Sequence, residues 1–228
     1  MRSIEQINFI KQEQSPPKQI LNLVNEKKIN FLLDYYNNST DIIIKNTGPK
    51  VLKVKPGEGI IDDIIENLKS VIGNFEVRAA HFFDVSRPHI IHNDDDKSLP
   101  KSYKAITLPL YINGDNIPEL IFFDQYYYQG PVKCVKNSNK DMPIYYNNLL
   151  KEYSEIENLN NKGIPEDIKT NLLTHLKDEW LEGFSIHSYF PWIIGSGIIF
   201  DSLQLHCASD FTSKNITQKI GLSIFTVK

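Results

Sequence analysis

HIIHNDDD, residues 89–96, brings two histidines and three aspartates together in eight consecutive positions. In an extended strand, side chains two positions apart share a face and those three apart point to opposite faces. His92 and Asp94 can therefore act together with Asn93 turned away, whereas His89 and His92 are poor partners. An imidazole and a carboxylate on one face suit iron(II), which accepts mixed nitrogen and oxygen ligands.

An HxD pattern is weak by itself, because such short patterns often arise by chance. The alternative interpretation is a polar strand end followed by an acidic loop. Asp95 and Asp96 belong to that loop, and we expect both carboxylates to be solvated. The metal hypothesis therefore depends on a third ligand elsewhere in the chain.

His206 is the candidate for that third ligand, in the stretch GSGIIFDSLQLHCASDF. Thirteen residues later, Lys219 opens the apolar segment KIGLSIFTV. A lysine at the head of an otherwise buried strand is unfavourable unless its charge is paired. It either extends to the surface, as long side chains do, or meets an anionic ligand inside the protein. Cys207 should point away from the metal if its strand is regular.

The rest of the chain predicts helices followed by many short strands. Residues 17–36 and 60–73 carry apolar residues at helical spacing, and the second segment ends at Gly73. Short β-branched and aromatic segments follow, separated by Pro, Gly and Asn. A polar, mostly helical insert occupies about residues 135–182, with NLLTHLKDEWLEG as its clearest helix. This order predicts helices packed on the outside of a β-sandwich or jelly roll.

We expect one domain over residues 1–228, because the chain has no internal repeat and no linker long enough to divide it. Residues 1–74 would supply the supporting helices, and residues 75–228 would form the jelly-roll core that contains the insert.

Composition narrows the class of protein. The 228 residues carry a formal charge of −3, with 41% hydrophobic and 23% charged residues, as in a globular protein with one sizeable core. Near-neutral charge argues against nucleic acid as a partner, although a local basic groove stays open. The chain start resembles no secretory signal, and no apolar stretch approaches the roughly 20 residues that span a bilayer. We therefore expect no membrane association. The chain has two cysteines, Cys134 and Cys207, without the spacing of a disulfide framework, which indicates a reducing, cytoplasmic location.

In this order the motifs resemble those of the 2-oxoglutarate- and iron(II)-dependent oxygenases, and of their prolyl-4-hydroxylase-like members. Their signature is HxD, a distant His, and an Arg or Lys that starts a strand; here it matches His92-Asn93-Asp94, His206 and Lys219. The resemblance covers about residues 75–228. It implies a mostly β fold with flanking helices, the double-stranded β-helix (jelly roll, cupin-like). It also implies that His92, Asp94 and His206 are the catalytic residues that hold Fe(II), with 2-oxoglutarate and O2 at the remaining metal positions.

The same resemblance implies a cosubstrate site. ITLPLYIN, residues 106–113, resembles the strand that follows HxD in these enzymes. This places Tyr111 where a phenol often hydrogen-bonds the cosubstrate carboxylate, with Thr107 on the same face. Lys219 would pair with the 5-carboxylate of 2-oxoglutarate, and Lys104 is the next candidate for that role.

The expected function is a dioxygenase that hydroxylates an unidentified small-molecule or peptide substrate and releases succinate and CO2. One alternative is a cupin-like metal-dependent enzyme that does not use 2-oxoglutarate, in which Lys219 has no obvious role. The other is a non-catalytic jelly-roll binding module, which predicts neither tight iron binding nor an effect of 2-oxoglutarate on stability. The substrate, the oligomeric state and the biological role are not indicated.

Overall fold

The computed structural model describes residues 2–45, 48–95, 101–136 and 148–228. Its helices are α1 (Ile4–Gln12), α2 (Glu26–Asn37), α3 (Asp62–Ile72), α4 (Glu166–Leu172) and α5 (Asp178–Leu181). Its longer strands are β3 (Lys50–Val54), β4 (Glu76–Val85), β5 (Ser102–Ile112), β6 (Glu119–Tyr126), β9 (Ile186–Pro191), β10 (Gly197–Asp201), β11 (Gln204–Ala208) and β12 (Lys219–Val227). The short strands are β1 (Lys18–Ile20), β2 (Ile43–Ile44), β7 (Lys133–Cys134) and β8 (Leu149–Leu150), of which β7 and β8 form a separate parallel pair.

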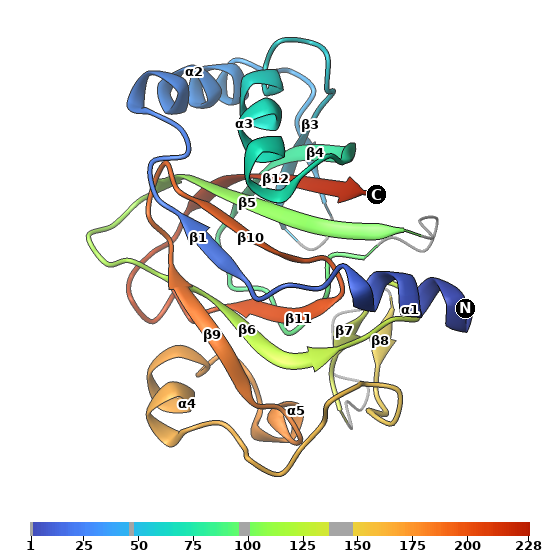
Figure 1. Ribbon diagram of the computed structural model, residues 1–228. Coiled ribbons are helices and arrows are strands. Elements are labelled where there is room, and N and C mark those ends of the chain that lie inside the picture. The colour runs from blue at the N-terminus through green and yellow to red at the C-terminus, as the bar shows by residue number, and fades with distance from the viewer. Residues whose placement is uncertain (1, 46–47, 96–100, 137–147) are drawn as a thin grey trace.

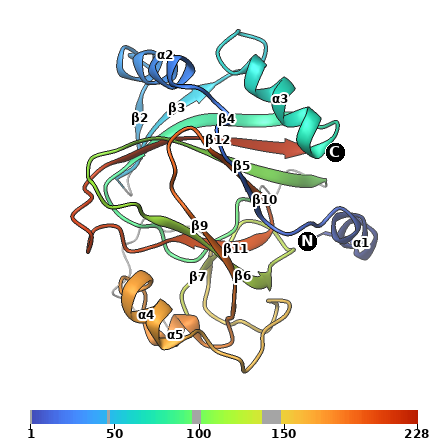
Figure 2. The same cartoon turned by 60° about the vertical axis from the view of Figure 1, so that its left-hand side comes forward.

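Two antiparallel sheets face each other (Figure 1). The major sheet has the strand order β1-β10-β5-β12-β4-β3-β2, and the minor sheet has the order β11-β6-β9. Strand β12 lies in the centre of the major sheet, between β5 and β4. Figure 2 shows α2 and α3 on the outer side of the major sheet, and α4 and α5 beyond the minor sheet.

Side chains along β12 alternate between two regions of the interior, one under the helices and one between the sheets. Ile220, Leu222 and Ile224 belong to the apolar cluster that α2 and α3 cover. Because neighbouring side chains on a strand point to opposite faces, Lys219 and Ser223 face the space between the two sheets. That space also holds a smaller apolar cluster, formed by Ala105, Leu120, Phe122, Ile198 and Phe200.

The N-terminal region differs in part from the expected helices. The helix predicted over 60–73 is confirmed as α3, and Gly73 after it adopts a positive φ of 78°. The helix predicted over 17–36 is wrong in its first half, because Lys18–Ile20 forms a strand that pairs with β10. The helix begins only at Glu26, after Asn25, whose side chain accepts a hydrogen bond from the Lys28 N–H. Residues 1–74 therefore contribute three strands to the major sheet besides their helices.

The insert over residues 135–182 is less helical than expected. Its helices in the described residues are α4 and α5, and residues 137–147 lie outside the described part of the chain. NLLTHLKDEWLEG is not one helix, because the chain turns between Leu172 and Asp178. The turn lets Leu173, Leu176 and Trp180 join the apolar cluster of the minor sheet, so tertiary packing overrides helix propensity here.

None of the helices in the described ranges is long and apolar enough to cross a bilayer. Both cysteines are buried and form no disulfide.

Candidate metal centre and cosubstrate site

Two strand segments bring His92, Asp94 and His206 together. His206 lies on β11, and its backbone N–H and C=O each pair with those of His92 at 2.9 Å. The Asp94 N–H donates to the Ser202 carbonyl at 2.9 Å, which holds Asp94 beside the start of β11. One possible ligand atom from each of the three side chains lies within 4.8 Å of the others.

Backbone carbonyls orient both imidazoles. His92 Nδ1 lies 2.7 Å from the Ile90 carbonyl oxygen, and His206 Nδ1 lies 3.0 Å from the Gln204 carbonyl oxygen. Because a carbonyl can only accept, each Nδ1 carries the proton and each Nε2 keeps its lone pair. The Nε2 atoms lie 3.7 and 3.6 Å from the two carboxylate oxygens of Asp94. The free donor atoms therefore converge on one point.

Burial disfavours the charged forms of the carboxyl and imidazole groups in this cluster. Burial raises the pKa of the Asp94 carboxyl, against the opposing effect of His206. Burial also holds the pKa of His92 well below its usual value, and the neighbouring His89 and His206 lower it further. A divalent cation would compensate a buried carboxylate between two neutral imidazoles. Two nitrogens and one oxygen on one side of a metal form the donor set suited to non-haem iron(II), so the residues present fit Fe(II).

The surroundings of the three side chains are mostly as expected, with one exception. Asn93 is turned away, and its amide donates to the carbonyls of Tyr127 and Gly130. Cys207 joins the apolar cluster on the other side of the minor sheet, which confirms that it points away. The His89 ring, however, lies 4.2 Å from the His92 ring, because the chain between them is not a regular strand.

Asp95 is also not where the sequence suggested. Its carboxylate is completely buried, and both of its oxygens contact the Arg2 guanidinium at 2.6 Å. The Ser102 hydroxyl donates to the same carboxylate at 2.8 Å. The expectation that Asp95 is solvated is therefore wrong, because a cation from the N-terminal segment reaches it. Asp96 lies outside the described residues.

Lys219 is buried on the inner face of the major sheet, with 2% of its surface exposed. Its Nζ lies 3.9 Å from the ring centroid of Trp192 and 4.8 Å from that of Phe211. It forms no ion pair with any residue that the structure describes. Burial lowers the pKa of Lys219 to about 7, although the charge of Glu119 acts in the opposite direction.

Glycine makes the contact between the indole and this ammonium group feasible. A Cβ atom at Gly221 would lie 2.5 Å from the Phe83 side chain and 3.0 Å from that of Trp192. Any larger residue would push the aromatic rings away from Lys219. The contact between Trp192 and Lys219 has no signal in the sequence.

A β-bulge in β5 places Thr107 and Tyr111, the two residues expected to assist Lys219, on opposite faces of the sheet. Thr107 is 6% exposed and lies opposite Ser223 on the inner face, as expected. Between the Gly221–Pro109 pair and the Ile220–Tyr111 pair, β5 contains one extra residue. The bulge places Tyr111 opposite the outward-facing Ile220, and 37% of Tyr111 is exposed. The expectation that Tyr111 shares the face of Thr107 is therefore wrong.

Lys104 has a different partner. Its Nζ forms a buried ion pair with Asp201, and it also donates to Ser15 Oγ at 2.8 Å and to the Glu13 carbonyl at 3.0 Å. Because these groups already compensate its charge, Lys104 is not free to serve as the cosubstrate counter-ion.

Comparisons with known proteins rest on structure alone, since no family model matches the chain and no curated protein matches it. The viral collagen prolyl hydroxylase vCPH from Paramecium Bursaria Chlorella virus-1, solved as a 2OG complex, aligns with a TM-score of 0.51 at 11% identity, over 93% of this chain and 96% of that chain. The non-heme alpha ketoglutarate dependent epimerase SnoN from nogalamycin biosynthesis aligns at 0.53 and 7%, over 98% and 82%. A Pseudomonas putida prolyl-4-hydroxylase aligns at 0.50 and 8%, over 98% of each chain.

The fold is the double-stranded β-helix. The double-stranded β-helix accounts for the two facing sheets and for the inward position of Lys219 at the start of a central strand. It confirms the mostly β architecture with flanking helices that the sequence predicted. At these identities the comparisons show the fold and leave the chemistry to the residues themselves.

Proposed function

We propose that the protein is an Fe(II)- and 2-oxoglutarate-dependent dioxygenase that hydroxylates a small-molecule or peptide substrate and releases succinate and CO2. The support is the convergence of two imidazoles and one carboxylate between the sheets, together with a buried lysine on the same interior surface that has no ion-pair partner among the described residues. Nucleic acid stays outside the expected partners, because the net charge of −3 provides no general attraction for it.

Each residue has a defined part in this proposal. His92, Asp94 and His206 would hold the iron through Nε2, a carboxylate oxygen and Nε2. Lys219 would form a charge-assisted contact with the 5-carboxylate of 2-oxoglutarate, and the Thr107 hydroxyl would donate a hydrogen bond nearby. When bound, the iron supplies the redox chemistry that couples O2 and 2-oxoglutarate to substrate oxidation.

Aromatic side chains protect this site from water. The Phe200 ring lies 4.7 Å from the His206 ring, and the Phe122 ring lies 5.8 Å from it. Both phenylalanines belong to the apolar cluster between the sheets. Excluding water strengthens the ion pair at Lys219 and keeps the reaction away from bulk solvent.

Lys219 is the observation that favours 2-oxoglutarate over the alternatives. A cupin-like enzyme that uses only a metal has no role for a buried ammonium group, and a binding module has no role for the ligand cluster. An unpaired buried cation is unfavourable, so its retention is explained when an anionic ligand completes it.

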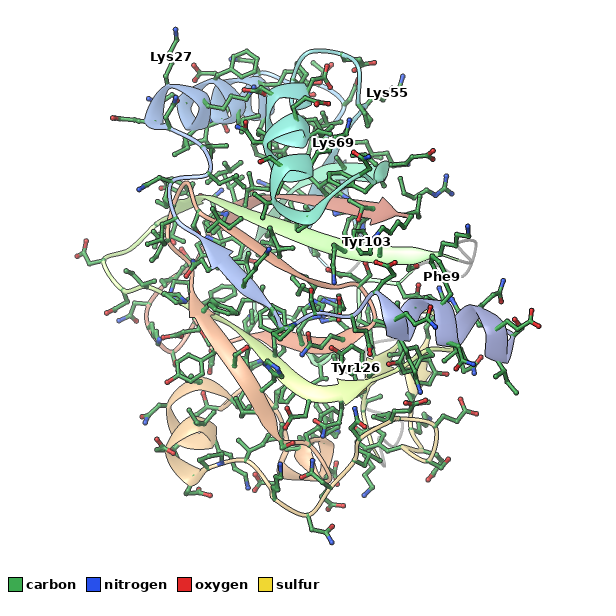
Figure 3. All side chains as sticks on the ribbon, in the orientation of Figure 1. Phe9, Lys27, Lys55, Lys69, Tyr103 and Tyr126 are labelled. Carbon is green, nitrogen blue, oxygen red and sulfur yellow. The ribbon has the colours of Figure 1, made fainter. Side chains whose placement is uncertain are left out.

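The test is an anaerobic titration of the protein with Fe(II) and then 2-oxoglutarate, following the weak visible charge-transfer band. We expect the band in the natural protein, no band in His206→Ala, and a dissociation constant for 2-oxoglutarate raised roughly 30- to 150-fold in Lys219→Ala, equivalent to about 2–3 kcal/mol. Lys27→Ala is the control, since Figure 3 shows Lys27 projecting outward from α2. A band of equal strength in all variants would contradict the proposal.

A further inference from the structure

A pocket of about 380 Å³ reaches the carboxylate of the metal centre. Strands β4 and β12 of the major sheet supply one part of its lining, which includes His81 and Phe225. The segment that holds Asp94 and the turn before β11, with Ser202, supply another part. A pocket of this size suits one small molecule, so the side chains that line it are candidates for contacting the molecule that the metal centre oxidises.

Strand pairing places His81 at this pocket. His81 lies opposite Ser223 of β12, and Ser223 is on the inner face of the major sheet. The imidazole ring stacks on the Phe225 ring, with 5.3 Å between centroids. Stacking engages the face of the imidazole, whereas its hydrogen bonds form in the ring plane. The contact with Phe225 therefore leaves both ring nitrogens available.

The hydrogen-bonding capacity of His81 is unused by the protein. Neither ring nitrogen makes a hydrogen bond with any residue that the structure describes. Burial, aided by the charges of Lys45 and Lys53, lowers the pKa of His81 to about 4. Neither lysine lines the pocket. At neutral pH the ring is uncharged, so it offers one N–H donor and one acceptor nitrogen.

The charged groups that line the pocket are already engaged. Asp94 belongs to the metal centre, and Asp95 is paired with Arg2 at 2.6 Å. Arg78 has an interaction partner of its own. A further charge brought into this pocket would lack a counter-charge, which is unfavourable, whereas an uncharged polar group needs only a hydrogen-bond partner.

Most of the uncharged polar side chains in the lining are also used by the protein. Asn93, Ser102 and Thr226 all hydrogen-bond to protein groups. The exceptions are the imidazole of His81 and the hydroxyl of Ser202, which form no hydrogen bond within the described parts of the chain. These two groups are therefore the ones that can give a ligand its directional contacts.

We propose that the molecule oxidised at the metal centre presents an uncharged hydroxyl or amide group to His81 and Ser202, with an apolar part against the Phe225 ring. The oxidation of this molecule rests on the proposed function, whereas the preference for uncharged polar ligands does not. His81 is then a specificity-determining residue, because a ligand without a matching donor or acceptor leaves its nitrogens unpaired.

The test uses the full chain loaded with Zn(II), as a diamagnetic stand-in for iron, and with 2-oxoglutarate. The probes have similar shape and different polarity: benzamide, benzyl alcohol, toluene, benzoate and benzylamine. Backbone amide NMR signals of Ala79 and Phe225 follow binding. We expect saturable shifts with benzamide or benzyl alcohol, at a dissociation constant about fivefold or more below those of the other three probes. The stronger of the two identifies the polar group.

His81→Phe is the informative variant, because it keeps a ring that can stack on Phe225 and removes both nitrogens. Its affinity for the uncharged polar probes should fall about fivefold, to that for toluene, while toluene binding stays unchanged and shows that the pocket is intact. His187→Phe is the matched control, since it makes the same substitution at an exposed position of β9 and should preserve the preference.

Equal binding of benzamide and the charged probes, no saturable shift with any probe, or an unchanged preference in His81→Phe would overturn the inference. If toluene binding falls as well, His81→Gln decides, because glutamine restores a donor and an acceptor: recovery of the preference supports the inference, and its absence overturns it.

The Trp192 indole signal reports separately on 2-oxoglutarate beside Lys219. An indole shift without a probe preference would refute the uncharged polar substrate alone. A probe preference without an indole shift would refute the proposed cosubstrate alone.

Discussion

The Arg2 guanidinium holds the Asp95 carboxylate through two contacts of 2.6 Å, one residue beyond the metal-ligand candidate Asp94. Both side chains are buried, with 7% and 0% exposed. Arg2 also donates to the Tyr128 carbonyl at 2.8 Å, so it joins the segment that follows His92 to the segment that follows β6. The first residues of the chain therefore fix the position of the metal centre.

Removal of this guanidinium should loosen the metal centre. We expect Arg2→Ala to weaken metal binding by about tenfold, the lower end of the range for groups that bond a ligand directly, because Arg2 acts through the neighbouring Asp95. Isothermal titration with Zn(II) or anaerobic Fe(II) measures the effect directly.

Lys11→Ala provides the control, because it breaks an ion pair between α1 and Glu157 that is largely solvent-exposed. A similar loss of metal affinity in both variants would mean that Arg2 acts only by docking α1. Recovery in Arg2→Lys would show that charge without the bidentate fork is sufficient.

Binding of 2-oxoglutarate should weaken as the pH rises. Burial lowers the pKa of Lys219 to about 7, and only the charged lysine attracts a carboxylate. The dissociation constant should therefore be lowest below pH 7 and rise by up to roughly tenfold for each pH unit above it. Around this group, Glu119 is the charged neighbour that raises its pKa, and Trp192 and Phe211 are uncharged.

Fluorescence of Trp192 at pH 6 to 9 follows this titration, since the indole contacts the lysine. Lys219→Arg is the diagnostic variant, because a guanidinium stays charged throughout this range. A pH profile that is equally steep in the natural protein and in Lys219→Arg would assign the dependence to another group.

Lys219→Met should make the ligand-free protein more stable while abolishing 2-oxoglutarate binding. The pKa of the lysine is lower in the folded state than in the unfolded state, so its charge opposes folding at pH 7. The gain should be about 1–3 kcal/mol, and it should disappear above the unfolded-state pKa of roughly 10.5, where both states are neutral. Thermal unfolding at pH 7 and pH 10.5 tests this sign. A variant less stable than the natural protein at pH 7 would contradict it.

The bulge in β5 distinguishes two hydroxyl groups. Thr107 faces the interior and Tyr111 does not, so Thr107→Val should weaken 2-oxoglutarate binding by up to about tenfold, as expected for one hydrogen bond. Tyr111→Phe should leave the affinity unchanged. The reverse result in the same binding assay would show that Tyr111 reaches the cosubstrate after all.

The sequence alone indicated the candidate metal ligands because each of them stands out within its own short segment. The i, i+2 spacing of His92 and Asp94 needs only a short extended segment, and His206 and Lys219 stand out as polar residues in apolar strands. The helix α3 was also predictable, since its apolar spacing and terminal Gly73 are contained in one segment.

The remaining features depend on contacts between distant segments. The apolar residues around Ile20 fit a helix as well as a strand. They form strand β1 because the edge strand β10 provides hydrogen-bond partners for their backbone. The extra residue that turns Tyr111 outward becomes visible only in the register between β5 and β12. Arg2 and Asp95 are separated by 93 positions, so no local sequence pattern predicts their ion pair.

The central place of β12 has a consequence for how the molecule forms. This segment, residues 219–227, joins β5 to β4, and both of those neighbours precede it by more than a hundred positions. Loop closure over such separations makes folding slow, and a nascent chain that lacks these nine residues presents two unpaired strand edges. Assembly of the candidate metal centre should then follow synthesis of the final strand, so we expect a chain truncated before residue 219 to aggregate rather than fold.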